Sequence, residues 1–101
     1  GCMKYFLYKL IPPRPTFPKD MTDTEGELMQ EHFNYWKDLA DRRIAIAYGP
    51  VEDPKGVYGL AIIETEDETI AHDIRVNDPA IKRDVGFRSE IHLMPELILR
   101  R

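Results

Sequence analysis

The chain has 101 residues, of which 43% are hydrophobic and 32% are charged, and these fractions are ordinary for a globular domain. This length leaves room for one domain, and the apolar fraction excludes an intrinsically disordered chain. The 14 basic and 18 acidic residues give a net charge of −4, so we expect neither nucleic acid nor another polyanion to be the main partner.

The cysteine and hydropathy patterns favour a cytoplasmic protein without a membrane partner. Cys2 is the only cysteine, so the chain cannot form an internal disulfide, which is typical of a reducing compartment. No apolar run approaches the roughly 20 residues that cross a bilayer, and no signal-peptide pattern opens the chain. Gly1 is typical of a tag remnant and Met3 of a start residue, so the single predicted domain covers residues 3–101.

The first predicted element is a β-strand over residues 3–11, which are mostly aromatic and aliphatic and end at a proline pair. Pro12, Pro13, Pro15 and Pro18 follow closely on one another. Their fixed φ angles and missing N–H donors exclude a helix or a central strand, so we expect a stiff, extended loop. Long ordered loops often carry function, and we expect this one to overhang the mouth of a binding pocket.

A long amphipathic helix is predicted next. Two overlapping capping-box patterns, Thr22 with Glu25 and Thr24 with Glu27, place its start near residue 23. Apolar side chains then recur at helical spacing up to an arginine pair at 42–43, which we expect in the last turn, where positive charge suits the helix dipole. One apolar row comprises Leu28, His32, Tyr35 and Leu39, and the row beside it comprises Met29, Phe33, Trp36 and Ala40.

The middle of the chain predicts an antiparallel hairpin. Residues 44–48 indicate a short buried strand that ends at Gly49 and Pro50, and residues 57–64 indicate the next strand. The run 52–56 between them has the composition of a turn, so we expect a hairpin with a long loop.

The last third of the chain predicts two helices and a strand. Thr65 and Glu68 form a third capping-box pattern, which opens a helix that ends one residue before Asp78. Asp78 and Pro79 then begin a short helix, because Asp is favoured at the N-cap and Pro at the first helical position. Residues 86–94 alternate in polarity and predict the last strand. We expect the longer helix to bury Ile70, Ala71 and Ile74, and the strand to place Phe87, Ile91 and Leu93 on one face.

The predicted element order is β-α-β-β-α-β, which favours the α+β class and a ferredoxin-like protomer: a four-stranded antiparallel sheet with both helices on one face. A protomer of this size cannot cover the other face of its sheet. We therefore expect a homodimer that buries more than about 1,200 Å² in total. The apolar tail at residues 97–99 is a further surface that would need a partner.

His32 is the most informative candidate site residue, because it is a polar side chain on an apolar row of the long helix. An imidazole partly removed from water needs a hydrogen-bond partner, which also fixes its tautomer. Two interpretations remain open from the residues alone. His32 is either a core histidine bonded to the backbone or a catalytic base at a binding pocket.

Asp78 is the second candidate. Its predicted role as an N-cap explains the Asp-Pro pair without any catalysis, although a capping carboxylate can accept another hydrogen bond as well. We expect the Asp78 carboxylate to bond one nitrogen of His32 and to leave the other nitrogen facing a cavity. Such a pair fixes the imidazole tautomer and makes the free nitrogen a better base.

The remaining chemistry-bearing residues give weaker signals. His72 is expected to point to solvent, and His92 to share a polar strand face with Arg88 and Glu90. The histidines show no metal-ligand spacing, so we assign no metal. Ser89 is the only serine and no phosphate-binding glycine pattern occurs, so we assign neither a serine nucleophile nor a cofactor.

Several short motifs together resemble the YciI-like (YCII-related) proteins. The motifs are Glu31-His32, Tyr35-Trp36, Tyr48-Gly49-Pro50, Asn77-Asp78-Pro79-Ala80 and Gly86-Phe87. The similarity extends over residues 21–95 and leaves the proline-rich segment 12–18 outside. The resemblance implies a dimeric α/β barrel of two ferredoxin-like protomers, and a histidine–aspartate pair at the active site that is matched by His32 and Asp78. Family members of known activity include a dehydrochlorinase, so the resemblance also allows a lyase-type reaction.

Three functional hypotheses follow. The first is a small enzyme of the lyase or isomerase type, in which His32 and Asp78 perform acid–base chemistry on a small molecule. The second is a non-catalytic ligand-binding or accessory dimer that uses the same pocket. The third is a purely structural dimer. Turnover distinguishes the first hypothesis from the second, and failure to bind any ligand favours the third.

Overall fold

The computed structural model describes residues 2–100. Its elements are β1 (Lys4–Ile11), α1 (Asp23–Asp41), β2 (Ala45–Val51), β3 (Tyr58–Thr65), α2 (Glu68–Asn77), α3 (Pro79–Lys82) and β4 (Arg88–Met94). Gly1, which the sequence suggested to be a tag remnant, and Arg101, the last residue of the predicted domain, lie outside the described residues. The order of strands and helices agrees with the predicted order.

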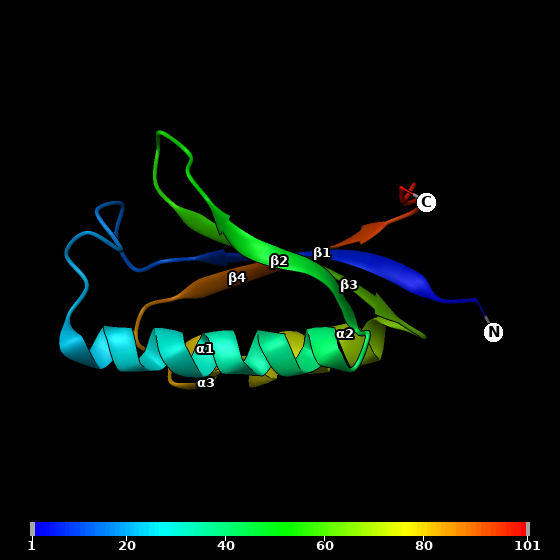
Figure 1. Ribbon diagram of the computed structural model, residues 1–101, viewed down its shortest axis with the longest axis horizontal. Helices are drawn as coiled ribbons and strands as arrows, with labels where there is room; N and C mark the ends of the chain where they lie inside the picture. Colours follow the sequence, from blue (N-terminus) through cyan, green and yellow to red (C-terminus); the bar gives the residue numbers. More distant parts are fainter. Residues whose placement is uncertain (1, 101) are drawn as a thin grey trace.

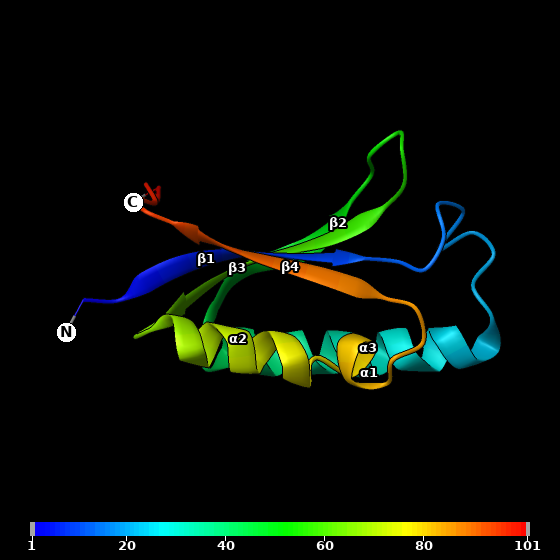
Figure 2. The same cartoon turned by 180° about the vertical axis from the view of Figure 1, so that it is seen from behind.

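The four strands form one antiparallel sheet in the order β2-β3-β1-β4. The helices lie together on one face of this sheet, and the other face is bare apart from the β2–β3 connection, which rises above it (Figure 1). The view from behind shows α2 and α3 side by side with α1 in the same layer (Figure 2). The chain is therefore a small α+β fold of two layers, as predicted.

Alternation along β1 explains how the core forms between the layers. Phe6, Tyr8 and Leu10 point toward the helices and are buried, whereas the residues between them face the bare side of the sheet. The other large buried residues of the core are Phe17, Leu28, Trp36, Leu39, Ile63, Ile74 and Phe87. Because β1 lies between β3 and β4, its inward side chains reach both α1 and the α2–α3 junction.

The start of α1 follows the first of the two competing capping boxes. The Thr22 hydroxyl accepts from the Glu25 N–H at 3.1 Å, and the Glu25 carboxylate accepts from the Thr22 N–H at 2.9 Å. The prediction that residues 42–43 form the last turn was wrong, because the helix ends at Asp41. Arg43 turns the chain with a φ of 64°, and the Ile44 N–H then bonds the Leu39 carbonyl, which is the Schellman way of ending a helix.

β2 differs from the predicted strand in its end and in its exposure. The strand does not stop at Gly49 but continues through Pro50 to Val51, with Pro50 opposite Gly59 of β3. An edge strand tolerates a proline, because it needs ladder hydrogen bonds on one side only. The edge position also explains why Tyr48 and Ile46 remain exposed, although a buried strand was expected.

α2 begins later than its sequence pattern suggested. Asp67, and not Thr65, is the N-cap, and its carboxylate accepts from the Ile70 N–H at 2.9 Å. The Thr65 hydroxyl is used instead to donate to the Asp67 carbonyl at 2.8 Å. Ala71 is buried as expected, but Ile70 is exposed, since adjacent residues of a helix point in directions about 100° apart.

The proline-rich segment is compact rather than extended. Successive turns are closed by hydrogen bonds from Phe17 N–H to the Arg14 carbonyl at 3.2 Å and from Lys19 N–H to the Thr16 carbonyl at 2.9 Å. The Phe17 side chain is buried in the core, which a loop that only bridged two elements would not require. The segment is therefore a packed part of the domain.

Beyond β4 the tail leaves the sheet, with Ile98 and Leu99 exposed. Over residues 2–100, no helix combines the length and the apolar character that a membrane span requires.

Candidate functional site

His32 projects from the inner side of α1 into the layer between helix and sheet. It lies one turn after the buried Leu28 and one turn before the buried Trp36, so the amphipathic pattern of α1 directs it inward. Its side chain keeps only 14% of its surface exposed. The imidazole therefore needs a partner inside the protein.

Asp78 lies at the junction between α2 and α3. Its carboxylate accepts from the Ala80 N–H at 3.0 Å, which makes it the N-cap of α3, with Pro79 at the first helical position, as predicted. The residue is 0% exposed. A fully buried carboxylate is costly unless several donors surround it, so the cap alone does not account for its stability there.

The structure brings the two candidates together. His32 Nδ1 lies 2.9 Å from each carboxylate oxygen of Asp78, although 46 positions separate the residues in the chain. An ionised carboxylate can only accept, so Nδ1 carries the proton and donates it to Asp78. Nε2 is then the unprotonated ring nitrogen with a free lone pair, and within residues 2–100 it has no hydrogen-bond partner.

Two further side chains donate to the same carboxylate. The Tyr8 hydroxyl of β1 and the Trp36 Nε1–H of α1 each lie 2.9 Å from Asp78 Oδ2. With His32 and the Ala80 N–H, the carboxylate accepts from four groups, from β1, α1 and α3. Asp78 is therefore the point at which the sheet and the helices are joined by polar contacts.

These contacts determine the charge of Asp78. Burial alone would raise its pKa, but the hydrogen bonds from His32, Trp36 and Ala80 outweigh burial and hold the pKa below its usual value. Burial and then the charge of Asp78 raise the pKa of Tyr8, and the same causes raise the pKa of Tyr35 to about 12. The site thus holds one buried negative charge beside neutral phenols.

A surface ion pair flanks the buried contact. Both carboxylate oxygens of Glu31 accept from Arg83 Nη2 at 2.8 Å. Glu31 precedes His32 on α1, and Arg83 follows the last residue of α3. The ion pair therefore connects the two helices that carry His32 and Asp78.

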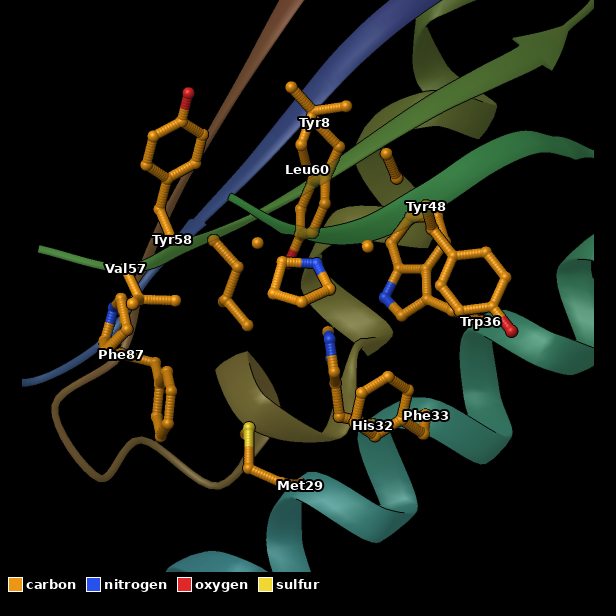
Figure 3. Close-up of a pocket in the computed structure, with 16 residues that line it drawn as sticks. Tyr8, Met29, His32, Phe33, Trp36, Tyr48, Val57, Tyr58, Leu60 and Phe87 are labelled. Atoms are coloured by element: carbon orange, nitrogen blue, oxygen red, sulfur yellow. The ribbon is translucent and has the colours of Figure 1, made fainter. Parts of the chain in front are cut away.

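A pocket of about 90 Å³ lies beside His32. It is smaller than the clefts that hold drug-sized ligands, so it suits only a compact molecule. Figure 3 shows His32 between two groups of side chains, with Phe87 and Val57 on one side and Trp36 and Tyr48 on the other. The lining is apolar and aromatic, and its aromatic members besides His32 are Tyr8, Phe33, Trp36, Tyr48, Tyr58 and Phe87.

The other predicted residues lie outside this site. His72 pairs with Glu68 on the exposed side of α2, and His92 pairs with Glu90 on β4 at 3.0 Å, as the sequence pattern suggested. In the described part of the chain, no cluster of His, Cys, Asp and Glu side chains is suited to hold a metal ion.

Two donors to Asp78 were not predicted as members of the site. Trp36 was expected only on an apolar row of the long helix, and the other donor is Tyr8. Tyr8 lies two residues from both Phe6 and Leu10 on the strand, so it faces inward as they do. A buried tyrosine hydroxyl usually needs a hydrogen-bond partner. That signal does not identify Asp78 as the partner, because the strand lies 70 positions away in the chain. Only the packing of β1 against the α2–α3 junction brings them together.

Comparison with known proteins agrees with this geometry at the level of the fold. A family model for the YCII-related domain matches residues 3–95. The chain belongs to the YCII-related family. The predicted family resemblance is thereby confirmed, and the matched region includes both His32 and Asp78. It is longer than the predicted 21–95, because it also covers the first strand and the proline-rich segment 12–18. No curated protein sequence matches the chain.

Two solved structures share the arrangement of strands and helices. The uncharacterized protein TM1266 from Thermotoga maritima aligns with a TM-score of 0.50 and 8% identity, over 90% of this chain and 95% of that one. The NE2512 protein of unknown function from Nitrosomonas europaea aligns with a TM-score of 0.50 and 11% identity, over 98% of this chain and 96% of that one. At such low identity these similarities show the fold alone.

Proposed function

We propose that this YCII-related protein is a small enzyme that uses His32 and Asp78 for acid–base chemistry of the lyase or isomerase type. One observation carries the proposal. The fully buried Asp78 holds Nδ1 of His32 at 2.9 Å, while the same imidazole lines an apolar pocket. A histidine that served only to fill the core would not need to face a pocket.

The proposed chemistry is a proton transfer at Nε2 of His32. A bound molecule gives a proton from an acidic O–H or C–H group to Nε2, and the resulting imidazolium is stabilised by the negative charge of Asp78. The ligand keeps the electron pair of the broken bond, which then drives elimination or rearrangement within the ligand. The other ionisable groups of the lining are Tyr8, Tyr48 and Tyr58. The proposal includes no covalent intermediate, because burial and the charge of Asp78 raise the pKa of Tyr8, which donates to that carboxylate and stays a neutral phenol.

The lining also indicates the class of molecule. Phe33, Trp36 and Phe87 offer aromatic faces and edges, and His32 offers a ring nitrogen that can accept a proton. A compact and mostly apolar molecule, such as a phenol, satisfies both features. Its acidic group would point toward His32 and its ring would lie among the aromatic side chains.

The proposal includes assembly as a homodimer. In a ferredoxin-like protomer the bare face of the sheet is the surface that a second copy would cover, giving a dimeric α/β barrel. Leu7 of β1, Ile62 of β3 and Met94 of β4 lie on this face, as the strand register requires. Burial of these side chains would stabilise two facing sheets. A single domain over residues 3–101 and a cytoplasmic location remain parts of the same proposal.

The alternative is a ligand-binding or accessory protein without turnover. It is favoured by the apolar lining, which would hold an aromatic molecule even if His32 only donated or accepted a hydrogen bond. The two functions differ in whether the ligand loses its proton.

A coloured phenol tests this difference directly. 4-Nitrophenol should bind in the pocket and become ionised at a pH at which the free compound is largely neutral, so that its phenolate absorbance appears on titration with the protein. The His32→Gln variant should lose this absorbance, and the His72→Gln variant, which alters an exposed histidine of α2, should keep it. Binding without ionisation favours the alternative, and equal ionisation by the His32→Gln variant contradicts the proposal.

A further inference from the structure

The proline-rich segment 12–18 lies within the family match but carries none of the motifs on which the resemblance was predicted, and it contributes to the pocket. Pro12 lines the pocket directly. Phe17 is buried and meets the Phe87 ring edge to face, with ring centres 5.5 Å apart and planes at 86°. Phe87 in turn lines the pocket, so the segment reaches it at two points.

The two ends of the pocket differ in exposure. Phe87 is 8% exposed and Leu10 is 3% exposed, so this end is closed. Phe33 is 47% exposed and Tyr48 is 37% exposed, so the pocket opens between α1 and the edge strand β2. Figure 3 shows Phe87 and Tyr48 on opposite sides of His32. A ligand that enters beside Tyr48 and reaches His32 would therefore extend toward Phe87.

The closed end is held by contacts that leave it little freedom. Arg14 donates to both oxygens of Glu25 at 2.7 and 2.8 Å and to Asp20 at 2.9 Å, which ties the segment to the first turn of α1. Gly86 has a φ of +104°, and a Cβ added there would lie only 2.9 Å from the Cβ of Pro13. The backbone just before Phe87 is therefore packed tightly against the segment.

We propose that the proline-rich segment 12–18, acting through Phe17 on Phe87, determines how long a ligand the pocket accepts. Phe87 is then a specificity-determining residue that would touch the far end of the ligand, and Phe17 is a positioning residue that supports it. The inference rests on the proposed function, because it takes the pocket beside His32 to be the binding site. It also changes the role expected for the segment, from a cover over the pocket mouth to a support for the closed end.

The test compares a short and a long phenol. Phenol and 4-phenylphenol share the acidic group that would face His32, but the second ring of 4-phenylphenol extends farther from it. Affinities are measured by isothermal titration calorimetry for the wild type, Phe87→Ala and Phe17→Leu, and for Phe33→Ala as the matched change at the open end. If Phe87→Ala fails to fold, Phe87→Leu replaces it. Loss of stability alone would weaken both ligands together, so the ratio of the two affinities is the informative quantity.

The wild type should prefer phenol. Phe87→Ala should shift the ratio toward 4-phenylphenol by about tenfold or more, which is the scale of a small change in the size of an apolar pocket. Phe17→Leu should shift the ratio in the same direction by a smaller factor, and Phe33→Ala should leave it unchanged. An unchanged ratio in both the Phe87 and Phe17 variants overturns the inference, as does an equal shift in Phe33→Ala. Failure of the acid–base proposal is seen separately, as phenol binding that His32→Gln does not alter.

Discussion

The Tyr8 hydroxyl donates to Oδ2 of Asp78 at 2.9 Å, and this is one of the two oxygens that His32 Nδ1 contacts at the same distance. β1, an internal strand of the sheet, and the candidate base thus share one buried carboxylate. Stability of the fold and the state of the site are therefore coupled through Asp78.

Replacing Asp78 by Asn should destabilise the protein and impair the site. Tyr8, Trp36 and the Ala80 N–H all donate to this side chain. The amide NH₂ of an asparagine cannot accept, so the donors that face it would lose their acceptor. A buried group left without a partner costs about 1–3 kcal/mol. Urea unfolding of Asp78→Asn should show a loss of that order, and 4-nitrophenol should no longer be ionised. Wild-type stability in this variant would contradict the described network.

Tyr8→Phe and Tyr35→Phe form a matched pair. Each change removes one hydroxyl. A hydrogen bond to a charged group is worth about 1.5–3 kcal/mol and one to a neutral carbonyl about 0.5–1.5 kcal/mol, so Tyr8→Phe should lose more stability than Tyr35→Phe. Only Tyr8 contacts Asp78, whereas the Tyr35 hydroxyl donates to the Ile74 carbonyl at 2.7 Å. Ionisation of bound 4-nitrophenol should therefore change in Tyr8→Phe and not in Tyr35→Phe. Equal responses of the two variants would show that the Tyr8 contact has no effect on the site.

Stability should fall at acidic pH. The pKa of Glu25 is lowered to about 2 by its hydrogen bonds from Arg14, and the pKa of Asp78 also lies below its usual value. Carboxylates with a lowered pKa contribute stability above their unfolded pKa, and this contribution is lost as the pH falls through the folded value. The free energy of unfolding should thus decrease from about pH 4.5 toward pH 2. In Glu25→Gln this decrease should be smaller, and an unchanged acid profile would contradict the role of the Arg14–Glu25 pair.

Stability should also fall at alkaline pH, for the opposite reason. The pKa of Tyr35 is raised to about 12, first by burial and then by the charge of Asp78. A phenol with a raised pKa contributes stability below its unfolded value, near 10, and this contribution is lost as the pH rises toward the folded value. Unfolding followed between pH 9 and 12 should show the loss, and Tyr35→Phe should reduce it. A flat profile in the wild type over this range would contradict the assignment.

A charge on the bare face of the sheet should separate the proposed dimer. Leu7 of β1 and Ile62 of β3 are opposite each other on that face. Leu7→Glu places a carboxylate where the second sheet would pack, and burying an unpaired charge is costly. Sedimentation should show a monomer for this variant and a dimer for the wild type and for Val76→Glu, a matched change at an exposed position of α2. A monomeric wild type at micromolar concentration would contradict the proposed dimer.

The sequence predicted the two central residues of the site because each carries a local signal. His32 is a polar residue at a helical position where apolar residues recur, and the Asp78–Pro79 pair is a helix start in its own right. Their contact follows once the fold places α1 beside α3. The helix cap at Thr22 was also recoverable, since the residues that form it lie within one turn.

Features that depend on distant packing could not be predicted in the same way. The partner of Tyr8 depends on how β1 lies against the α2–α3 junction, and the exposure of Tyr48 depends on β2 being an edge strand. Likewise, the proline content of residues 12–18 indicates that the segment is stiff, but not where it packs on the rest of the domain. The burial of Phe17 against Phe87 is a tertiary contact that turns this stiff segment into a support for the pocket.

The most direct test of the central claim is to determine which nitrogen of His32 carries the proton. In a protein with isotope-labelled histidine, the ring nitrogen and carbon chemical shifts at neutral pH distinguish the two neutral tautomers. Because the Asp78 carboxylate accepts at Nδ1, the wild type should show the Nδ1–H tautomer with a free Nε2, and Asp78→Asn should move the proton to Nε2. A wild-type His32 that carries its proton on Nε2 would contradict the proposal that this nitrogen serves as the base.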